Sequence, residues 1–235
     1  MIRFILVALL VVGFLIFSIP LLLWENHVGK QDPEKQQAHS LKIVQAMFRL
    51  ILRISGVQVT VRGQERIPEG PVLYVGNHQS YFDILVGYTT VPTLLGFVAK
   101  KEMERYILLR DWMRNVNCLF LDRTDIKAGI SVWIFPEGTR NINEDVTELL
   151  PFKEGSLKIA EKAGCPIVPV AITGTSEVFE KHIPFIRRSQ VTIEFGEPFY
   201  AQELPLAERK HAGAYTRNKI IEMLKAEQQI RRSGK

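Results

Sequence analysis

Cysteine is scarce in this sequence: Cys118 and Cys165 are the only two among 235 residues. This excludes a disulfide-dense scaffold and a zinc site built from four thiolates. Glycine and proline are also limited, at 16 and 12 residues, while 46% of the residues are hydrophobic and 23% are charged. Such a composition excludes collagen-like, disordered and multi-span membrane proteins. The length is that of one ordinary domain with an appendage.

The net charge of +5 is concentrated at the C-terminus. Residues 207–235 contain eight Lys or Arg and three Asp or Glu, whereas residues 1–206 contain 22 of each. The body of the protein is therefore neutral, which argues against nucleic acid as the main partner. We expect a basic closing helix at the C-terminus, whose end is either solvated or in contact with anionic lipid.

The segment Phe4–Trp24 carries no charged residue and is interrupted only by Gly13, Ser18 and Pro20. As a helix it would be about 31 Å long, which matches the hydrocarbon thickness of a bilayer. We therefore expect a membrane anchor, in preference to a secretory signal peptide or a buried core helix. Pro20 leaves open a spanning helix or a re-entrant or interfacial hairpin. Basic residues favour a cytoplasmic body, with Lys30, Lys35 and Lys42 after the segment and Arg3 before it.

Residues 36–55 predict a second membrane-associated element. Within Leu41–Ile54 the polar residues recur every three or four positions, on one narrow stripe of a helix: Lys42, Gln45, Arg49 and Arg53. A basic stripe opposite a wide apolar face is typical of a helix lying at anionic headgroups. An ordinary helix packed on the domain explains the residue pattern equally well. We prefer the membrane-associated helix because the apolar segment Phe4–Trp24 lies close by in the sequence.

Seven β-rich runs alternate with helical segments in the rest of the chain. The expected strands are Val57–Val61, Val72–Val75, Leu94–Ala99, Val116–Leu121, Ser131–Phe135, Ile167–Ile172 and Val191–Phe195. The expected helices are Tyr81–Tyr88, Glu102–Met113, Ser156–Ala163 and Tyr215–Gln229. This alternation predicts an α/β fold with a mostly parallel central sheet flanked by helices, preceded by the N-terminal anchoring segment.

One connection is too short for this pattern. The fourth expected strand ends near Asp122, so only the eight residues 123–130 separate it from the fifth, which starts at Ser131. A parallel crossover generally needs about a dozen residues or more. These two strands are therefore antiparallel, non-adjacent, or missing a helix between them.

Candidate chemistry begins at the turn after the second expected strand. Gly76 and Asn77 suit a tight turn, and Ser80 with Asp83 makes a capping box for the next helix. This places His78 at the mouth of a strand–helix turn above a carboxylate. Asp83 can accept a proton from one ring nitrogen of His78 and leave the other nitrogen as a base. A cap and an ordinary turn residue explain the spacing equally well.

The His78–Asp83 spacing, together with Phe135–Arg140 (FPEGTR), resembles the glycerolipid acyltransferases, specifically the 1-acyl-sn-glycerol-3-phosphate acyltransferases. Further matching segments are Val98–Glu102, Leu119–Arg123, Pro151–Gly155, Ile167–Val170 and Phe195–Pro198. The likeness covers roughly residues 57–200 in the family's order. Together with the apolar N-terminal segment, it divides the chain into two expected parts. Residues 1–55 are the membrane anchor and interfacial helix, and residues 56–235 are the acyltransferase domain with its basic C-terminal helix.

The resemblance implies transfer of an acyl chain from acyl-CoA or acyl-carrier protein to the sn-2 hydroxyl of lysophosphatidic acid, without an acyl-enzyme intermediate. His78 would be the general base, and Asp83 would orient it. Arg140 is the first candidate to grip the phosphate, followed by Arg123 and Lys101. Gly138 and Thr139 belong to the same loop, where glycine allows close approach of the backbone. Glu137 either orders this loop or contacts the substrate.

Two departures from the family pattern bear on function. The helix that the family places between Arg123 and Ser131 is absent, which we expect to lower stability and leaves activity uncertain. Asn117 stands where the family usually has glycine. The alternatives are an acyltransferase for another lysophospholipid and a non-catalytic lipid-binding relative. The intact His78, Asp83 and FPEGTR residues favour an enzyme.

Other polar residues predict no further chemistry. Ser80 lacks the Gly-x-Ser-x-Gly context of a hydrolase nucleophile, so a helix cap is the better interpretation. The remaining histidines show no metal-ligand spacing: His27, His39, His182 and His211. We expect no cofactor and no metal, with acyl-CoA or acyl-carrier protein as co-substrate. We also expect a membrane lipid as the acceptor and a membrane location.

Overall fold

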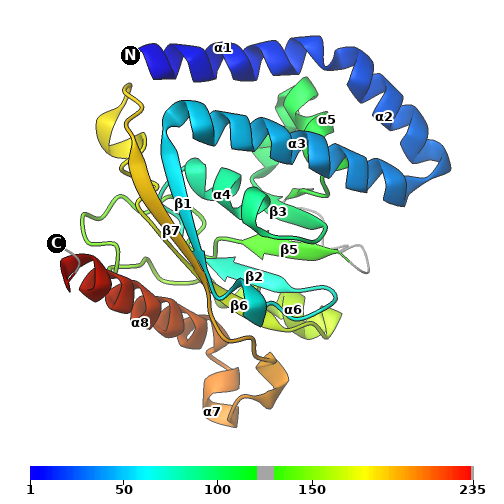
Figure 1. The fold of residues 1–235 in the computed structure, drawn as a ribbon. Coiled ribbons are helices and arrows are strands. Elements are labelled where there is room, and N and C mark those ends of the chain that lie inside the picture. Colours follow the sequence, from blue (N-terminus) through cyan, green and yellow to red (C-terminus); the bar gives the residue numbers. More distant parts are fainter. Residues whose placement is uncertain (121–129, 234–235) are drawn as a thin grey trace.

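The computed structural model describes residues 1–120 and 130–233, with a seven-stranded sheet at the centre (Figure 1). The strand order is β1-β7-β6-β2-β5-β3-β4. The strands are β1 (Val57–Arg62), β2 (Leu73–Gly76), β3 (Leu95–Ala99), β4 (Leu119–Phe120), β5 (Ser131–Ile134), β6 (Ile167–Thr173) and β7 (Ser189–Phe195). Neighbouring strands are parallel except β6 and β7. The predicted α/β fold with a mostly parallel sheet is confirmed.

Helices cover both faces of the sheet (Figure 1). They are α1 (Ile2–Phe17), α2 (Ile19–Gln31), α3 (Pro33–Ser55), α4 (Phe82–Thr90), α5 (Ile107–Asn115), α6 (Lys158–Ala163), α7 (Leu206–Arg209) and α8 (Ala212–Ser233). Short 3-10 turns include η2 (Lys101–Arg105), η3 (Glu154–Ser156) and η4 (Glu180–His182). The α1–α3 layer and α8 lie on opposite sides of the sheet.

The central strands have apolar residues at every position because both faces are covered. On β2, Tyr74 packs in the hydrophobic cluster that includes Val44 of α3 and Val86 of α4. Its neighbours Leu73 and Val75 belong to the cluster on the other face, which includes Ile220 and Leu224 of α8. The alternation of side chains along a strand thus builds two cores on one sheet.

The predicted helix Glu102–Met113 is wrong as a single element. Tyr106, at φ −87° and ψ 87°, separates the 3-10 turn η2 from α5. A residue with ψ near 90° lies outside the helical region, so the helix cannot continue through it. The apolar periodicity of this segment belongs to α5 alone.

The strand predicted from Val116 begins later, at Leu119. Asn117 has a φ of +60°, which a strand residue cannot adopt. Asparagine and glycine are the residues that tolerate this left-handed conformation best. The same backbone angle therefore explains why asparagine can stand where the family usually has glycine.

The short connection joins strands that are not neighbours. β3 lies between β4 and β5 and is parallel to both. Of the three predicted alternatives, the non-adjacent arrangement is confirmed. Residues 121–129, with Arg123 among them, lie outside the described part of the chain.

The apolar segment at the N-terminus forms two helices that meet at Ser18. Ser18 is buried and accepts a hydrogen bond from Nε1 of Trp112 on α5 at 3.0 Å, and Pro20 occupies the first turn of α2. Across residues 1–120 and 130–233, no single helix is both long and apolar enough to cross a membrane. The pair α1 and α2 reaches the required length and composition together, with a bend of 52°.

Helix α3 packs on the domain through one face of the helix. Leu41, Val44, Ile51 and Leu52 are buried, whereas Leu50 and the arginines Arg49 and Arg53 are exposed. The side chain of Asp32 accepts the N–H of Lys35 and begins the helix. The interfacial position of this helix stays a prediction.

The basic C-terminal helix is held on the sheet by one of its own arginines. Arg231 donates to the side chains of Glu227, Thr173 and Thr192 at 2.7, 2.9 and 3.0 Å. This cation thus serves the packing of α8 against β6 and β7, on the face of the sheet opposite α1–α3.

Candidate active site

The candidate residues follow the carboxyl ends of neighbouring parallel strands. His78 follows β2, the Phe135–Arg140 segment follows β5, and Lys101 follows β3. Since β2, β5 and β3 are adjacent, their carboxyl ends meet at one edge of the sheet. This edge is where open α/β sheets place their ligand sites.

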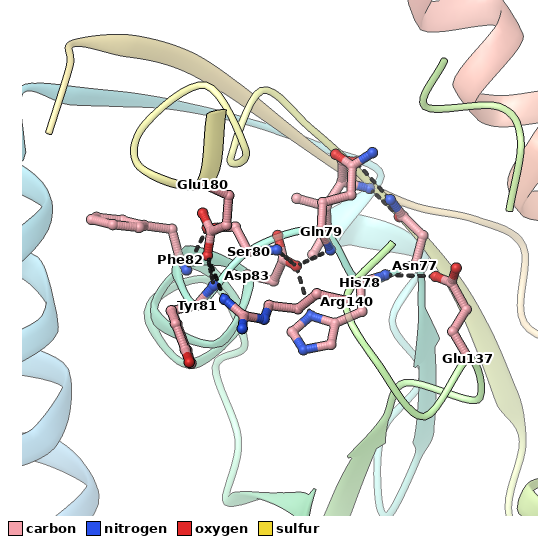
Figure 2. A network of polar contacts seen from close by, with 11 residues as sticks. Asn77, His78, Gln79, Ser80, Tyr81, Phe82, Asp83, Glu137, Arg140 and Glu180 are labelled. Atoms are coloured by element: carbon pink, nitrogen blue, oxygen red, sulfur yellow. Dashed lines mark hydrogen bonds and ion pairs between the residues drawn. The ribbon is translucent and has the colours of Figure 1, made fainter. Parts of the chain in front are cut away.

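His78 and Asp83 form the predicted pair. Nδ1 of His78 lies 2.8 Å from Oδ2 of Asp83, which also accepts the backbone N–H groups of Gln79 and Ser80 at 2.7 and 2.8 Å (Figure 2). An ionised carboxylate can only accept, so Nδ1 carries the hydrogen and Nε2 is the basic nitrogen. The Asp83 side chain is completely buried, whereas 15% of the His78 side chain is exposed.

The ring of His78 is also held by an aromatic neighbour. Phe135 stacks on it with ring centroids 4.1 Å apart and an interplanar angle of 10°. Phe135 is the first residue of the FPEGTR segment, so the two predicted motifs meet at this contact. The imidazole is therefore fixed in position by packing and in tautomer by Asp83.

The predicted cap Ser80 lies one residue before Tyr81, the N-cap of α4, and bonds to the first residue of the helix. Its Oγ accepts the N–H of Phe82 at 3.0 Å, and its own N–H is bound by Asp83. The carboxylate half of the predicted capping box is therefore present, whereas Ser80 Oγ binds the N–H of Phe82 and not that of Asp83. Ser80 is fully buried, which leaves no path for a substrate to its hydroxyl.

Glu137 joins the two motifs through backbone contacts. Its Oε1 accepts the N–H of His78 at 2.8 Å, and its Oε2 accepts the N–H of Leu150 at 3.0 Å. Burial raises the pKa of this carboxyl, and the two N–H groups oppose that shift. Of the two predicted alternatives, these contacts match the ordering of the loop.

Arg140 lies over the aromatic ring of Tyr81, with its Cζ 4.0 Å from the ring centroid. Its Nη1 donates to Oε1 of Glu180 at 3.2 Å, and the same oxygen accepts the N–H of Tyr81 at 2.9 Å. Figure 2 shows this guanidinium on the same side of the turn as the His78 ring. Arg140 is thus a fixed and partly exposed cation beside the histidine.

Sequence reasoning missed Glu180 and Tyr81. Glu180 belongs to the connection that follows β6, the strand beside β2 in the sheet. A search of every acidic residue after the carboxyl end of an expected strand could have found it. Tyr81 stands within the predicted motif, but its ring gives no signal of its own in the sequence.

The loop between Glu137 and Arg140 turns at Gly138. This residue has a φ of +70°, and a Cβ added here would lie 2.7 Å from Nζ of Lys153. The ammonium group of Lys153 therefore lies against the loop backbone at Gly138. Thr139 is exposed at the same loop.

The two other predicted phosphate ligands are less well defined. Lys101 is exposed at the start of η2, one strand beyond β5. Arg123 lies outside the described residues. In the part of the chain that the structure describes, no group of three or more His, Cys, Asp or Glu side chains is placed to hold a metal ion.

Comparison with known proteins places the main residues of this site within a known family. Residues 58–173 match the family model described as Acyltransferase, a range that contains His78, Asp83 and Arg140. The chain belongs to the acyltransferase family. The family match ends before Glu180.

Named relatives of this acyltransferase chain include two eukaryotic proteins. It is 26% identical over 206 residues to the 1-acyl-sn-glycerol-3-phosphate acyltransferase of Saccharomyces cerevisiae, covering 81% of this chain and 68% of that protein. It is 31% identical over 164 residues to the human 1-acyl-sn-glycerol-3-phosphate acyltransferase alpha, covering 62% of this chain and 56% of the human protein. The chain thus spans between about half and two thirds of these two relatives.

A solved structure resembles the whole acyltransferase chain. The crystal structure of the 1-acyl-sn-glycerophosphate (LPA) acyltransferase PlsC from Thermotoga maritima superposes with a TM-score of 0.77 at 26% identity. The superposition covers 96% of this chain and 95% of that chain. The likeness therefore extends well beyond residues 58–173, which the family model matches.

Proposed function

We propose that this protein transfers an acyl chain from acyl-CoA or acyl-carrier protein to the sn-2 hydroxyl of lysophosphatidic acid, which gives phosphatidic acid. The observation that carries the proposal is the His78–Asp83 pair, at 2.8 Å and beside the fixed cation Arg140. The names of the relatives and the superposed structure support the acceptor.

The chemistry follows from the geometry of this pair. Nε2 of His78 removes the proton from the sn-2 hydroxyl while the hydroxyl oxygen attacks the thioester carbonyl carbon. Asp83 stabilises the imidazolium that forms. The C–S bond then breaks, and the leaving thiolate takes the proton from the imidazolium. A positioned base of this kind contributes about 10²–10⁴-fold to the rate.

The phosphate group of the acceptor requires cations at the same edge of the sheet. Arg140 is the principal candidate, since a guanidinium can meet two phosphate oxygens at once. Lys101 and Arg123 are assigned to the same task by family resemblance. Gly138 and Thr139 form the loop surface that such a phosphate would approach.

The two N-terminal helices support a membrane location. Large apolar side chains more than one third exposed gather on them: Ile2, Ile5, Leu6, Leu9, Val12, Ile16, Phe17, Leu23 and Trp24. An exposed apolar surface of this kind marks a site of membrane or protein contact. A lipid acceptor could then remain in the bilayer, which avoids about 0.8 kcal/mol for each methylene exposed to water. The lysines after α2 favour the cytoplasmic side of the membrane.

The test is an assay of the full chain in detergent micelles with lysophosphatidic acid and labelled acyl donors. Acyl-CoA and acyl-carrier protein are supplied in separate reactions, and other lysophospholipids are compared as acceptors. His78→Ala should lower the rate of phosphatidic acid formation by about 10²–10⁴-fold. The matched control His211→Ala removes an exposed histidine between α7 and α8 and should change nothing.

Three results would contradict the proposal in whole or in part. Equal rates for the parent protein and His78→Ala would remove the histidine from the mechanism. No product from the parent protein with either donor would favour a lipid-binding role. Faster transfer to another lysophospholipid would replace the acceptor and leave the general-base mechanism intact.

A further inference from the structure

Glu180 contacts the site without belonging to either predicted motif. Its Oε1 accepts from both Nη1 of Arg140 and the backbone N–H of Tyr81. Only 12% of its side chain is exposed, compared with 34% for Arg140. The carboxylate therefore lies behind the guanidinium, on the side turned away from solvent.

The position of Glu180 is fixed from several directions. The N–H of Tyr81 holds its carboxylate, and Val178, two positions before Glu180, is fully buried. Between them Phe179 stacks on Phe4 of α1, with ring centroids 5.8 Å apart. A carboxylate anchored in this way does not need to move when a ligand arrives.

The backbone of one turn thus orients two carboxylates. The consecutive N–H groups of Gln79 and Ser80 bind Asp83, and that of Tyr81 binds Glu180. Asp83 in turn fixes His78, and Glu180 fixes Arg140 (Figure 2). The ring of Tyr81 supports the guanidinium plane from below, since a cation over an aromatic face is attracted to it.

We propose that Glu180 and Tyr81 are positioning residues that hold the guanidinium of Arg140 ready for the phosphate group of the acceptor. This inference rests on the proposed function, because it concerns the same acceptor. A guanidinium has five N–H donors, and the bond to Glu180 takes one of them. The opposite role for Glu180 is competition, in which its carboxylate binds Arg140 in place of the phosphate. The experiment distinguishes these two roles.

The experiment compares Glu180→Ala with Glu180→Gln, Arg140→Ala and the matched control Glu177→Gln. Glu177 lies on the same connection but pairs with Lys181 and His182. Steady-state rates are measured with lysophosphatidic acid and with a monoacylglycerol, which lacks the phosphate. Equilibrium binding of lysophosphatidic acid in micelles is measured separately, without an acyl donor.

Glu180→Ala should raise the KM and the Kd for lysophosphatidic acid by about tenfold to hundredfold, which is the usual range for a lost charge-assisted hydrogen bond. Its turnover of monoacylglycerol should not change. Arg140→Ala should raise the KM and the Kd for lysophosphatidic acid by the same factor or more, again without a change in the turnover of monoacylglycerol. Glu180→Gln should keep most of the binding, because its amide oxygen can accept both bonds. Glu177→Gln should behave as the parent protein.

Three results would overturn the inference. A lower KM for lysophosphatidic acid in Glu180→Ala would show competition with the phosphate. An equal loss with both acceptors would reduce Glu180 to a general structural role. Binding of lysophosphatidic acid that is unaffected by Glu180→Ala and Arg140→Ala would place the phosphate elsewhere. If the proposed function is wrong, the parent protein will show no acyl transfer. The binding measurement, which needs no acyl donor, still decides the role of Glu180 in that case.

The contribution of Tyr81 is tested by a pair of substitutions. Tyr81→Phe keeps the ring and should leave the KM for lysophosphatidic acid unchanged. Tyr81→Ala removes the ring and should raise that KM, by less than Glu180→Ala does, because cation–π contacts at exposed positions are weaker than charge-assisted hydrogen bonds. Equal KM values for both variants would exclude the ring from this role.

Discussion

Two acidic residues, Asp83 and Glu180, bind the backbone of the same turn. Asp83 holds the imidazole of His78, and Glu180 holds the guanidinium of Arg140. Asp83 is completely buried, lies five positions after its partner His78, and binds two backbone N–H groups. Glu180 is partly exposed, comes 40 positions after Arg140, and binds one backbone N–H group. Both carboxylates are therefore held by backbone N–H groups and each orients one side chain. Asp83 is more deeply buried and binds more N–H groups than Glu180.

The difference between them predicts the kind of defect that each substitution causes. Asp83 acts on the group that exchanges a proton, so its loss should appear mainly in kcat. Glu180 acts on a group that only binds the acceptor, so its loss should appear mainly in KM. An interaction that is the same in ground and transition states changes KM, whereas one that strengthens in the transition state changes kcat.

The largest effect is expected at Asp83. Asp83→Asn can keep the hydrogen bonds to the turn but removes the negative charge that stabilises the imidazolium. We expect kcat to fall by about 10²–10⁴-fold with little change in the KM for the acceptor. The exposed Asp145→Asn is the control, measured in the same micellar assay. A rise in KM with an unchanged kcat would erase the distinction between the two carboxylates.

A smaller effect is expected at Glu137, which holds backbone rather than a reacting side chain. Glu137→Gln can satisfy only one of the two N–H groups, of His78 and Leu150, that the carboxylate binds. An unsatisfied buried N–H costs about 1–3 kcal/mol, so the free energy of unfolding in urea should fall by that amount. Activity should fall by less than in Asp83→Asn. Unchanged stability would mean that the loop is held by other contacts.

The smallest effect on function is expected at Glu227, a buried carboxylate of α8 that binds Arg62, Thr192 and Arg231 and none of the candidate site residues. Burial raises its pKa, but hydrogen bonds from Arg231 and Thr192 and the charge of Arg62 outweigh this and lower the pKa below 4.5. A lowered pKa means that the ionised form stabilises the fold. This contribution is present above about pH 4.5 and is lost as the pH falls through the folded pKa.

Glu227→Gln should therefore unfold more easily than the parent protein at pH 7 and lose less stability on acidification. Thermal unfolding at a series of pH values measures both. The acyl transfer rate at pH 7 should stay at the parent level below the melting temperature. If Glu227→Gln loses as much stability on acidification as the parent protein, other carboxylates are responsible for the acid sensitivity of the fold.

The same comparison explains what could be predicted from the sequence. Asp83 and His78 stand on one strand–turn–helix unit, so local spacing alone brings them within reach. The contact between Arg140 and Glu180 depends on the sheet order, in which β6 and β5 flank β2. Periodicity gives the strands but not their order, so this pair could not be predicted from spacing.

Several element boundaries were predicted wrongly for reasons that the apolar pattern does not contain. Tyr106 divides an expected helix, and Asn117 delays an expected strand, because their backbone angles leave the helical and extended regions. Ser18 divides the apolar N-terminal segment through a hydrogen bond to Trp112, which is distant in sequence. Each of these interruptions depends on a backbone angle or a distant partner.

The most direct test of the mechanism is a double-mutant cycle on His78 and Asp83, with kcat measured for the parent protein, His78→Ala, Asp83→Ala and the double variant. If Asp83 acts only through the imidazole, the double variant will be no slower than His78→Ala alone. If the two losses multiply, Asp83 has a catalytic role that is independent of His78, and the proposed general-base pair is contradicted.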